Sequence, residues 1–295
     1  MQKISILTVD LEDWFHILNH DYNDYHGWSG FQPHIHKTVE WLLGVLERYN
    51  TTATFFAIGW MAWRYPELID SISRHGHEVG IHTYYHQRMD AFGEKSFYKD
   101  LINTSQVVES ITGIKPVSFR APGFSVNRIN IHLLWQLKKL GVQNDSSVVP
   151  GWHTYGHFPD FPYRHPARIQ FPDAFMIREF PINSAGIGKL RFIYAGGGYF
   201  RLMPYNLTRR MMKTNAYNMT YFHPREFHGN SPRVPDLSPV RRWKLYQNMT
   251  RNPRKFEKLL ADFSFTSIEQ ASQTINWQKT PLYKVADANS FKGSG

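Results

Sequence analysis

The sequence predicts an α/β protein in which parallel strands, each followed by a helix, form a barrel. Segments rich in β-branched and aromatic residues alternate with segments whose apolar residues recur at helical spacing. Such alternation is typical of parallel sheets, and at least five strand–helix units in succession favour a barrel over an open sheet. With 295 residues, of which 42% are hydrophobic, the chain is long enough to bury a sizeable core.

The expected elements follow one another in a regular order. Strands are predicted at residues 4–9, 52–58, 78–82, 116–120, 142–145, 219–223 and 265–268, and helices at residues 34–49, 61–74, 94–111, 130–140, 205–215 and 253–263. Residues 150–199 depart from this rhythm because they are rich in Pro, Gly, His and aromatic residues, which indicates a long loop with short antiparallel strands. We therefore expect one domain over residues 1–290, with an insertion at about 150–200 and a basic part at about 201–270.

The absence of cysteine excludes several kinds of chemistry. Disulfide frameworks, thiolate metal sites, iron–sulfur clusters and cysteine nucleophiles all need this residue, and the chain has none. Any metal must therefore be held by His, Asp or Glu. The N-terminal apolar run ends at Asp10, too early for a signal peptide, and no stretch of 18 apolar residues occurs. We expect a cytoplasmic protein.

The net charge of +10 is concentrated in one part of the chain. Residues 201–260 hold thirteen Lys and Arg residues against three acidic ones, so the remainder is neutral overall. Such asymmetry favours an anionic partner: a nucleic acid, an acidic membrane surface, or an acidic or phosphorylated substrate. No nucleic-acid-binding motif accompanies it, which argues against nucleic acid. A merely solvated basic face is the alternative.

Ionisable side chains gather at the predicted carboxyl ends of the strands, where parallel α/β proteins place their chemistry. They are Asp10, Glu12 and Asp13 after the first strand, His82 and His86 after the third, Arg120 and Asp145 at the ends of the fourth and fifth, and His223 after a later one. Carboxylates, imidazoles and an arginine without any thiol describe a metal-assisted hydrolase.

His82 and His86 are the first candidate metal ligands. A spacing of four places two imidazoles on one side of a helical turn, as a divalent metal requires. Among 15 histidines such pairs also arise by chance, and positions 16/20 and 153/157 share the spacing. The pair at 82 and 86 differs because it follows a strand directly. Asp10 can be a helix N-cap, but one carboxylate with two histidines would hold a metal and leave a position open for water.

Two further segments can supply the remaining chemistry. Arg120 can keep a carboxylate ionised through a bidentate pair, and Gly123 lets a backbone N–H approach a ligand as an oxyanion donor does. An ordinary Pro-Gly turn with a surface arginine is the alternative. His223 can donate a proton to a leaving amine, because the ordinary pKa of histidine is about 6.5.

The order of these motifs resembles the NodB-like polysaccharide deacetylases, carbohydrate esterase family 4. The resemblance is carried by an Asp-rich strand end, GHEVGIHTYYH at residues 76–86, FRAPGF at 119–124, an Asp-Ser-Ser strand end and a strand that ends in His223. EFPINSAG, GGGYFRLMPY and YFHPREF look like the subgroup from bacterial exopolysaccharide and surface-glycan biosynthesis clusters. The implied fold is a distorted (β/α)7-type barrel.

The resemblance implies a role for each matching residue. The metal, usually zinc, would be bound by His82, His86 and an aspartate of the first motif; cobalt, nickel or iron would also suit such a site. Another aspartate of that motif would be the general base, oriented by Arg120. His223 would be the general acid, and Asp145 would assist it or shape the pocket.

Two departures from the family pattern leave assignments open. The family has two adjacent aspartates, base then ligand, where this chain has Asp10-Leu11-Glu12-Asp13. Alignment on the strand makes Asp10 the base, and alignment on adjacency makes Glu12 the base. We expect Asp10 as base and Asp13 as ligand, with Glu12 as the alternate ligand. Gly123-Phe124 replaces a common Tyr-Gly, which keeps backbone donation to an oxyanion but changes the side chain that faces the substrate.

The implied activity is removal of an N-acetyl group from a sugar of a bacterial surface polysaccharide or its precursor. In the cytoplasm that precursor would be lipid-linked or nucleotide-linked, and the basic segment would meet pyrophosphate or the anionic inner membrane surface. Two alternatives remain: a small-molecule amidohydrolase acting on other C–N bonds, and a non-catalytic glycan-binding protein of the same fold.

Overall fold

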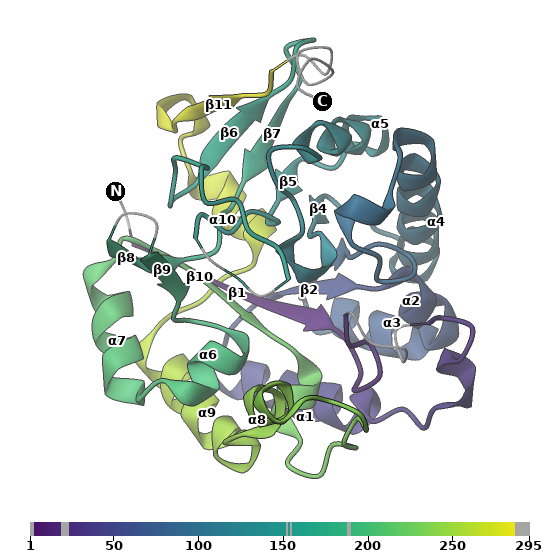
Figure 1. Cartoon of the computed structure of the whole chain (residues 1–295), viewed down its shortest axis with the longest axis vertical. Coiled ribbons are helices and arrows are strands. Elements are labelled where there is room, and N and C mark those ends of the chain that lie inside the picture. Colours follow the sequence, from purple (N-terminus) through teal and green to yellow (C-terminus); the bar gives the residue numbers. More distant parts are fainter. Residues whose placement is uncertain (1–2, 19–23, 152, 154, 188–189, 287–295) are drawn as a thin grey trace.

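The computed structural model describes residues 3–18, 24–151, 153, 155–187 and 190–286, and these form an α/β structure around a nine-stranded sheet (Figure 1). The strands are hydrogen-bonded in the order β10-β1-β2-β3-β4-β5-β7-β6-β11. Their bounds are β1 Ile4–Leu11, β2 Thr54–Ala57, β3 Glu78–Ile81, β4 Ser118–Phe119, β5 Asn144–Asp145, β6 Ala167–Gln170, β7 Met176–Glu179, β10 Tyr217–Phe222 and β11 Leu282–Lys284. The run from β10 to β7 is parallel throughout, and β6 pairs antiparallel with β7. The predicted parallel α/β fold is confirmed.

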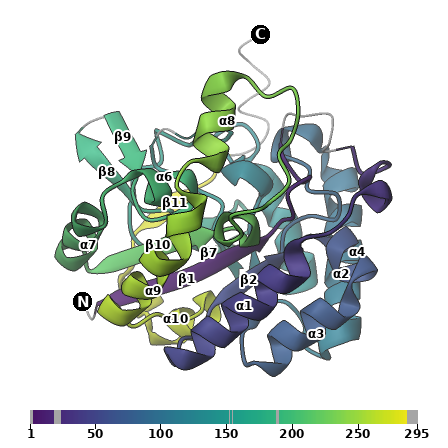
Figure 2. The same cartoon turned by 90° about the horizontal axis from the view of Figure 1, so that it is seen from below.

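Helices connect the parallel strands and cover them (Figures 1 and 2). Their bounds are α1 Ile35–Arg48, α2 Gly59–Arg64, α3 Pro66–Arg74, α4 Glu94–Thr112, α5 Leu137–Leu140, α6 Gly197–Leu202, α7 Tyr205–Thr214, α8 Pro239–Tyr246, α9 Asn252–Asp262 and α10 Ile268–Thr274. The helix predicted at 61–74 is interrupted before Pro66, which has no N–H and begins α3 instead. The helix predicted at 130–140 is a 3-10 helix at Ile131–Gln136 followed by α5.

The second half of the chain differs from the predicted order in two places. The strand expected at 265–268 is a single bridge between Ile6 and Thr266, because Ile268 already begins α10. Helix α8 lies outside the helices predicted from the sequence, and none of its residues is buried. The insertion does contain short antiparallel strands: β6 and β7 extend the main sheet, while β8 Ser184–Ile187 and β9 Leu190–Ile193 form a separate pair.

The parallel register brings the strand ends together at one edge of the sheet. Asp10 pairs with Phe56 on β2, and Val9 pairs with Phe222 on β10, so Glu12 and His223 leave neighbouring strands at a similar height. Ile81 pairs with Phe119 in the same way. The candidate residues therefore converge although more than 200 positions separate the first from the last. Within the described ranges, no helix is long and apolar enough to span a bilayer.

Candidate active site

Glu12, His82 and His86 form a cluster that can hold a metal ion. Glu12 Oε1 lies 3.0 Å from His86 Nε2 and 3.7 Å from His82 Nε2. One ligand atom from each residue falls within 4.8 Å of the others, and all three side chains are buried. Two imidazoles and one carboxylate are a donor set that suits zinc and related divalent metals.

The hydrogen bonding of His82 tests this interpretation. His82 Nδ1 lies 2.7 Å from the carbonyl oxygen of Arg120, and a carbonyl can only accept, so Nδ1 carries the proton. His82 Nε2 is then left with a lone pair that faces Glu12, and it is buried with no hydrogen-bond partner among the described residues. A ligating histidine typically binds through one nitrogen and donates its other N–H to such a carbonyl. The residues therefore fit a bound metal.

Asp13 does not join the two histidines, contrary to the ligand assignment expected from the sequence. Its carboxylate accepts the N–H of Trp14 at 2.7 Å and the N–H groups of His34 and Ile35, which begin α1. Side chains two residues apart point to the same side of an extended segment. Glu12 thus shares the side of Asp10, while Asp13 turns toward the helix and caps it. The structure places Glu12, the alternate, beside the histidines.

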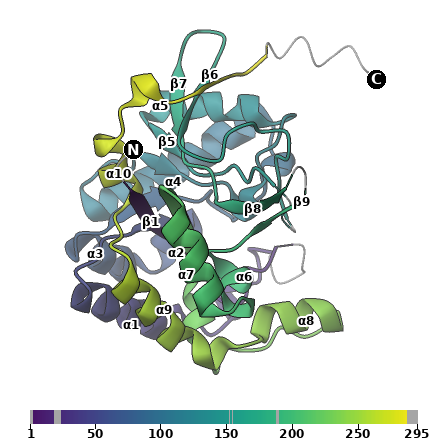
Figure 3. The ribbon, with the colours of Figure 1, turned by 90° about the vertical axis from the view of Figure 1, so that its left-hand side faces the viewer.

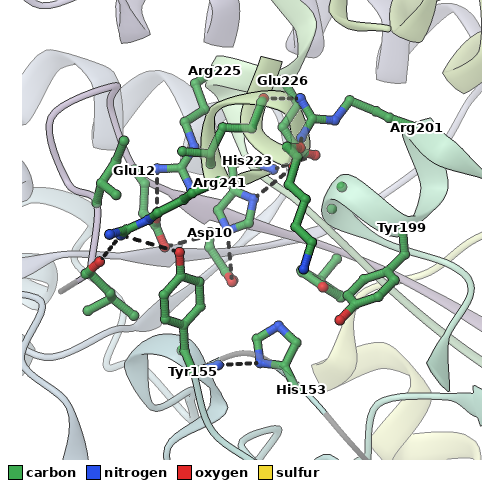
Figure 4. Close-up of a pocket in the computed structure, with 18 of the residues that line it drawn as sticks. Asp10, Glu12, His153, Tyr155, Tyr199, Arg201, His223, Arg225, Glu226 and Arg241 are labelled. Carbon is green, nitrogen blue, oxygen red and sulfur yellow. Dashed lines mark hydrogen bonds and ion pairs between the residues drawn. The ribbon is translucent and has the colours of Figure 1, made fainter. Parts of the chain in front are cut away.

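Asp10 is held by Arg120 in a buried ion pair. Arg120 Nη1 lies 2.7 Å from Asp10 Oδ1, and both side chains are almost fully buried. The guanidinium is fixed from other sides, since it also donates to Thr8 Oγ1 and to the hydroxyl and carbonyl of Ser146. The other carboxylate oxygen of Asp10 lies 4.0 Å from His223 Nε2 (Figure 4). Asp10 therefore has one oxygen anchored and one directed toward the site.

His223 lies between two carboxylates. Its Nδ1 is 3.3 Å from Glu226 Oε1 and its Nε2 is 3.5 Å from Glu12 Oε1. Burial alone lowers the pKa of His223, but the charge of Glu12 and the hydrogen bonds to Glu12 and Glu226 outweigh it and raise the pKa to about 9. Burial likewise opposes ionisation of Glu226, yet Arg201 and His223 hold its pKa below the ordinary value. The neighbouring carboxylates therefore favour the protonated form of His223, which is the form that can donate a proton.

Arg225 and Glu226 are site residues that the sequence reasoning missed. Arg225 Nη1 lies 2.9 Å from Glu12 Oε2, so the Glu12 carboxylate is held on the side away from the histidines. Glu226 takes the role of partner to His223 that was expected of Asp145. The available signal was their position in YFHPREF, directly after the strand that ends at His223.

Asp145 lies buried beside Glu179, with which its carboxyl interacts. Its carboxylate accepts from Ser147 Oγ at 2.5 Å, and Ser147 Oγ in turn accepts the N–H of Ala121. Burial and the charge of Asp145 raise the pKa of Glu179 well above its ordinary value. Asp145 thus supports the segment after Arg120 and does not line the cavity.

A cavity of about 390 Å³ opens onto these groups. Besides Asp10, Glu12 and His223, its lining includes Gly123, Phe124, His153, Tyr155, Tyr199, Arg201, Arg225, Glu226, Arg241 and Lys244 (Figure 4). Its volume is within the range of about 300–1,000 Å³ common for ligand pockets. The site is therefore a pocket large enough for a substrate, and Glu12, one of the three candidate metal ligands, is part of its lining.

Gly123 and Phe124 line this cavity in different ways. Gly123 has φ of +63°, and a Cβ there would lie 2.6 Å from Leu18 Cδ1 and 2.9 Å from Tyr155 Cβ. The backbone N–H of Phe124 donates to the carbonyl of Ala121 at 3.0 Å, so it is not a donor to a ligand. Phe124 instead lines the cavity with its aromatic ring, which packs against the ring of Tyr221.

Comparison with known proteins relates two parts of the chain to known families. Residues 26–144 match the model of the family described as polysaccharide deacetylase, and residues 146–273 match a domain of unknown function, DUF3473. Residues 26–144 thus carry a polysaccharide deacetylase domain of the NodB type, carbohydrate esterase family 4, as the resemblance indicated. Both matched ranges contribute strands to the same sheet and residues to the same cavity.

The relatives and solved structures vary in how much of the chain they cover. A peptidoglycan-N-acetylglucosamine deacetylase of Bacillus cereus is 31% identical over 81 residues, which is 28% of this chain and 30% of that protein. A solved polysaccharide deacetylase, described as putative, from Mycobacterium smegmatis covers 97% of this chain and 95% of its own, with 19% identity and a TM-score of 0.68. A family 4 pseudoenzyme from Bacillus anthracis covers 91% of this chain and 65% of its own, at 13% identity and a TM-score of 0.51. These two structures confirm the fold.

Proposed function

We propose that this protein is a metal-dependent N-deacetylase that acts on an N-acetylated sugar of a bacterial glycan. The observation that carries the proposal is the cluster of Glu12, His82 and His86, in which buried His82 Nε2 has a free lone pair. Beside it lie the Asp10–Arg120 pair and protonated His223. The glycan substrate is suggested by the family and by the peptidoglycan substrate in the name of the Bacillus cereus relative.

Glu12, His82 and His86 would hold the metal. When bound there, a divalent ion supplies Lewis-acid chemistry: it polarises the acetamide carbonyl and makes a nearby water more acidic. Arg225 holds Glu12 Oε2, which leaves Oε1 for the metal side. The carbonyl of Arg120 fixes the tautomer of His82, so a single residue supports both the ligand and the neighbouring base.

Hydrolysis of the acetamide requires two proton movements. Water adds its oxygen to the carbonyl carbon, the C–N bond breaks, and acetate and a free amine are released. Asp10 is placed to take the proton from the water, because Arg120 anchors Oδ1 and leaves Oδ2 facing the site. His223 is placed to deliver a proton to the nitrogen from Nε2, because Glu226 binds its Nδ1.

The metal, the substrate and the location can be proposed more specifically. Zinc is the expected metal, with cobalt, nickel or iron as substitutes. A surface exopolysaccharide, or its lipid-linked or nucleotide-linked precursor, is the expected substrate. We expect the protein to lie in the cytoplasm and to contact the anionic face of the membrane. The basic segment at residues 201–260 supports this expectation.

Acetate release from N-acetylated glycan oligomers tests the proposal directly. We expect zinc-loaded protein to release acetate and Asp10→Asn to lose about 10²–10⁴-fold of that activity, as general-base removal does. Because a solved structure of the same fold is described as a pseudoenzyme, the alternative is a glycan-binding protein without activity. Sugar binding by both proteins, with no acetate released by either in zinc, cobalt or nickel, would support that alternative.

A further inference from the structure

The basic segment singled out by the sequence reaches the cavity through α8. Ser238, Val240, Arg241, Lys244 and Leu245 all line the outer part of the cavity. Figure 3 shows α8 projecting from the body of the protein next to α6. Between positions 236 and 257 the chain has no acidic residue, and its basic residues there are Arg241, Arg242, Lys244, Arg251, Arg254 and Lys255. The wall formed by α8 is therefore positively charged.

The carboxylates of the cavity lie together at its inner end, and arginines already balance them there. Asp10 and Glu12 lie at the end of β1, and Glu226 follows β10. The ion pairs are Asp10–Arg120 at 2.7 Å, Glu12–Arg225 at 2.9 Å and Glu226–Arg201 at 3.9 Å. The acidic groups thus have their own counter-charges and do not neutralise α8.

The backbone of α8 is held in place at the outer end of the cavity. Arg201 of α6 donates from Nη1 to the carbonyl of Leu245 at 2.7 Å and from Nη2 to that of Lys244 at 3.1 Å, which fixes α8 against α6. Arg241 Nη2 donates to the carbonyl of Leu18 and lies 3.5 Å from the Tyr155 hydroxyl (Figure 4). Lys244 is exposed, and its ammonium makes no ion pair with any residue that the structure describes.

We propose that the outer end of the cavity binds an anionic group of the substrate, a phosphate or a carboxylate carried on or next to the N-acetylated sugar. This proposal rests on the proposed deacetylase function for the sugar itself. Tyr155 and Tyr199 also line the cavity and offer aromatic surface for the sugar ring. Lys244 offers an exposed ammonium on a flexible stem, and the Arg241 guanidinium adds a fixed positive charge to the same wall, a combination suited to an oxyanion.

Binding of three sugars to zinc-loaded protein tests the anion site. The probes are N-acetylglucosamine, its 1-phosphate, and N-acetylglucosaminuronic acid, measured by calorimetry at low and high salt. We expect the charged sugars to bind about 10-fold more tightly than the neutral one at low salt, with the difference shrinking as salt screens it. Preference for the phosphate or for the uronate alone would identify the source of the anion.

Two variants of α8 form a matched pair for the same measurement. Lys244→Met should weaken the binding of both charged sugars about 3–5-fold, the size expected for one exposed charge. The binding of the neutral sugar should not change. Arg242→Met is the control, since Arg242 is exposed on the same helix but does not line the cavity. Equal losses in both variants, equal binding of charged and neutral sugars, or no binding of any of the three would overturn the anion site.

Acetate release on the same samples separates this proposal from the deacetylase function. Acetate released from all three sugars without preference for the charged ones would overturn the anion site and leave deacetylation standing. Preferential binding of the charged sugars without acetate release would support the anion site and overturn deacetylation.

Discussion

Arg120 joins the two halves of the candidate site. Its Nη1 donates to Asp10 Oδ1 at 2.7 Å, and its backbone carbonyl accepts the N–H of His82 Nδ1 at 2.7 Å. The ion pair of Arg120 with Asp10 links positions 110 residues apart, and neither side chain reaches solvent appreciably. One residue at the end of β4 thus orients the expected base through its side chain and the expected metal ligand through its backbone.

Removing the guanidinium should destabilise the protein strongly. Arg120→Met leaves Asp10 buried without its counter-charge, and breaking a buried pair in this way costs about 3–5 kcal/mol of unfolding free energy. Denaturant unfolding of metal-free protein measures the loss. Adding Asp10→Asn to Arg120→Met should recover part of it, because the unpaired charge is then gone. A loss below about 1 kcal/mol in Arg120→Met would contradict a buried, structurally required pair.

Glu226→Gln should shift the pH dependence of the reaction. His223 must be protonated to donate, so kcat should fall as pH rises through the pKa of His223, which the Glu226 carboxylate helps to raise above its ordinary value. Removing the Glu226 charge lowers the pKa of His223, so the alkaline limb of the kcat profile should move to lower pH. His223→Gln should lower kcat about 10²–10⁴-fold and abolish that limb. An unchanged limb in Glu226→Gln would show that His223 is not the titrating acid.

The same group should make stability depend on pH in metal-free protein. Its folded pKa is above the ordinary value, so the stabilisation it contributes is complete below about pH 6.5 and is lost as pH rises through about 9. Unfolding free energies measured across that window should decline in the wild type and decline less in His223→Gln. Parallel profiles for the two proteins would rule out this coupling.

Because of Asp100, the folded protein should lose stability as pH rises from about 4 to about 7. Burial raises its pKa to about 7, although it accepts the N–H of Tyr84, between His82 and His86, at 2.9 Å. Because the folded state holds this proton more tightly than the unfolded state, its contribution is lost as pH rises from about 4 to about 7. Asp100→Asn keeps the acceptor oxygen, and its stability should therefore vary less over that window. A steeper slope than in the wild type would be the contrary result.

Gly123→Ala and Gly44→Ala should act in opposite directions. At Gly123 the positive φ and the close approach of Leu18 Cδ1 make a Cβ unfavourable, so we expect a loss of about 1–3 kcal/mol in unfolding free energy and weaker sugar binding. Gly44 lies exposed in α1 with nothing within 4 Å of an added Cβ, so alanine there should stabilise by about 0.5–1 kcal/mol. Thermal and denaturant unfolding of both variants measures the two effects.

Much of the fold and of the site could be predicted because hydrophobic periodicity locates strands and their ends. Asp10, His82, His86 and His223 were recognised from their positions after strands, and the structure brings them together. Helix α8 was missed in this way, since none of its residues is buried and its apolar side chains Val240 and Trp243 are exposed instead of packing in the core.

The choice among neighbouring carboxylates could not be made from spacing. Glu12 and Asp13 are adjacent, and only the direction of each side chain after β1 shows that Glu12 faces His86 while Asp13 caps α1. Arg225 was hidden for a similar reason, because its partner Glu12 is more than 200 residues away.

Metal content of matched variants tests the central claim most directly. We expect about one equivalent of divalent metal in zinc-treated wild type and in Asp13→Asn, and little or none in Glu12→Gln or in His82→Ala/His86→Ala, measured by elemental analysis after removal of unbound metal. Unfolding measurements on the same samples confirm that each variant is folded. Metal retained by Glu12→Gln and lost by Asp13→Asn would contradict the site described here, as would a folded wild type that binds no metal.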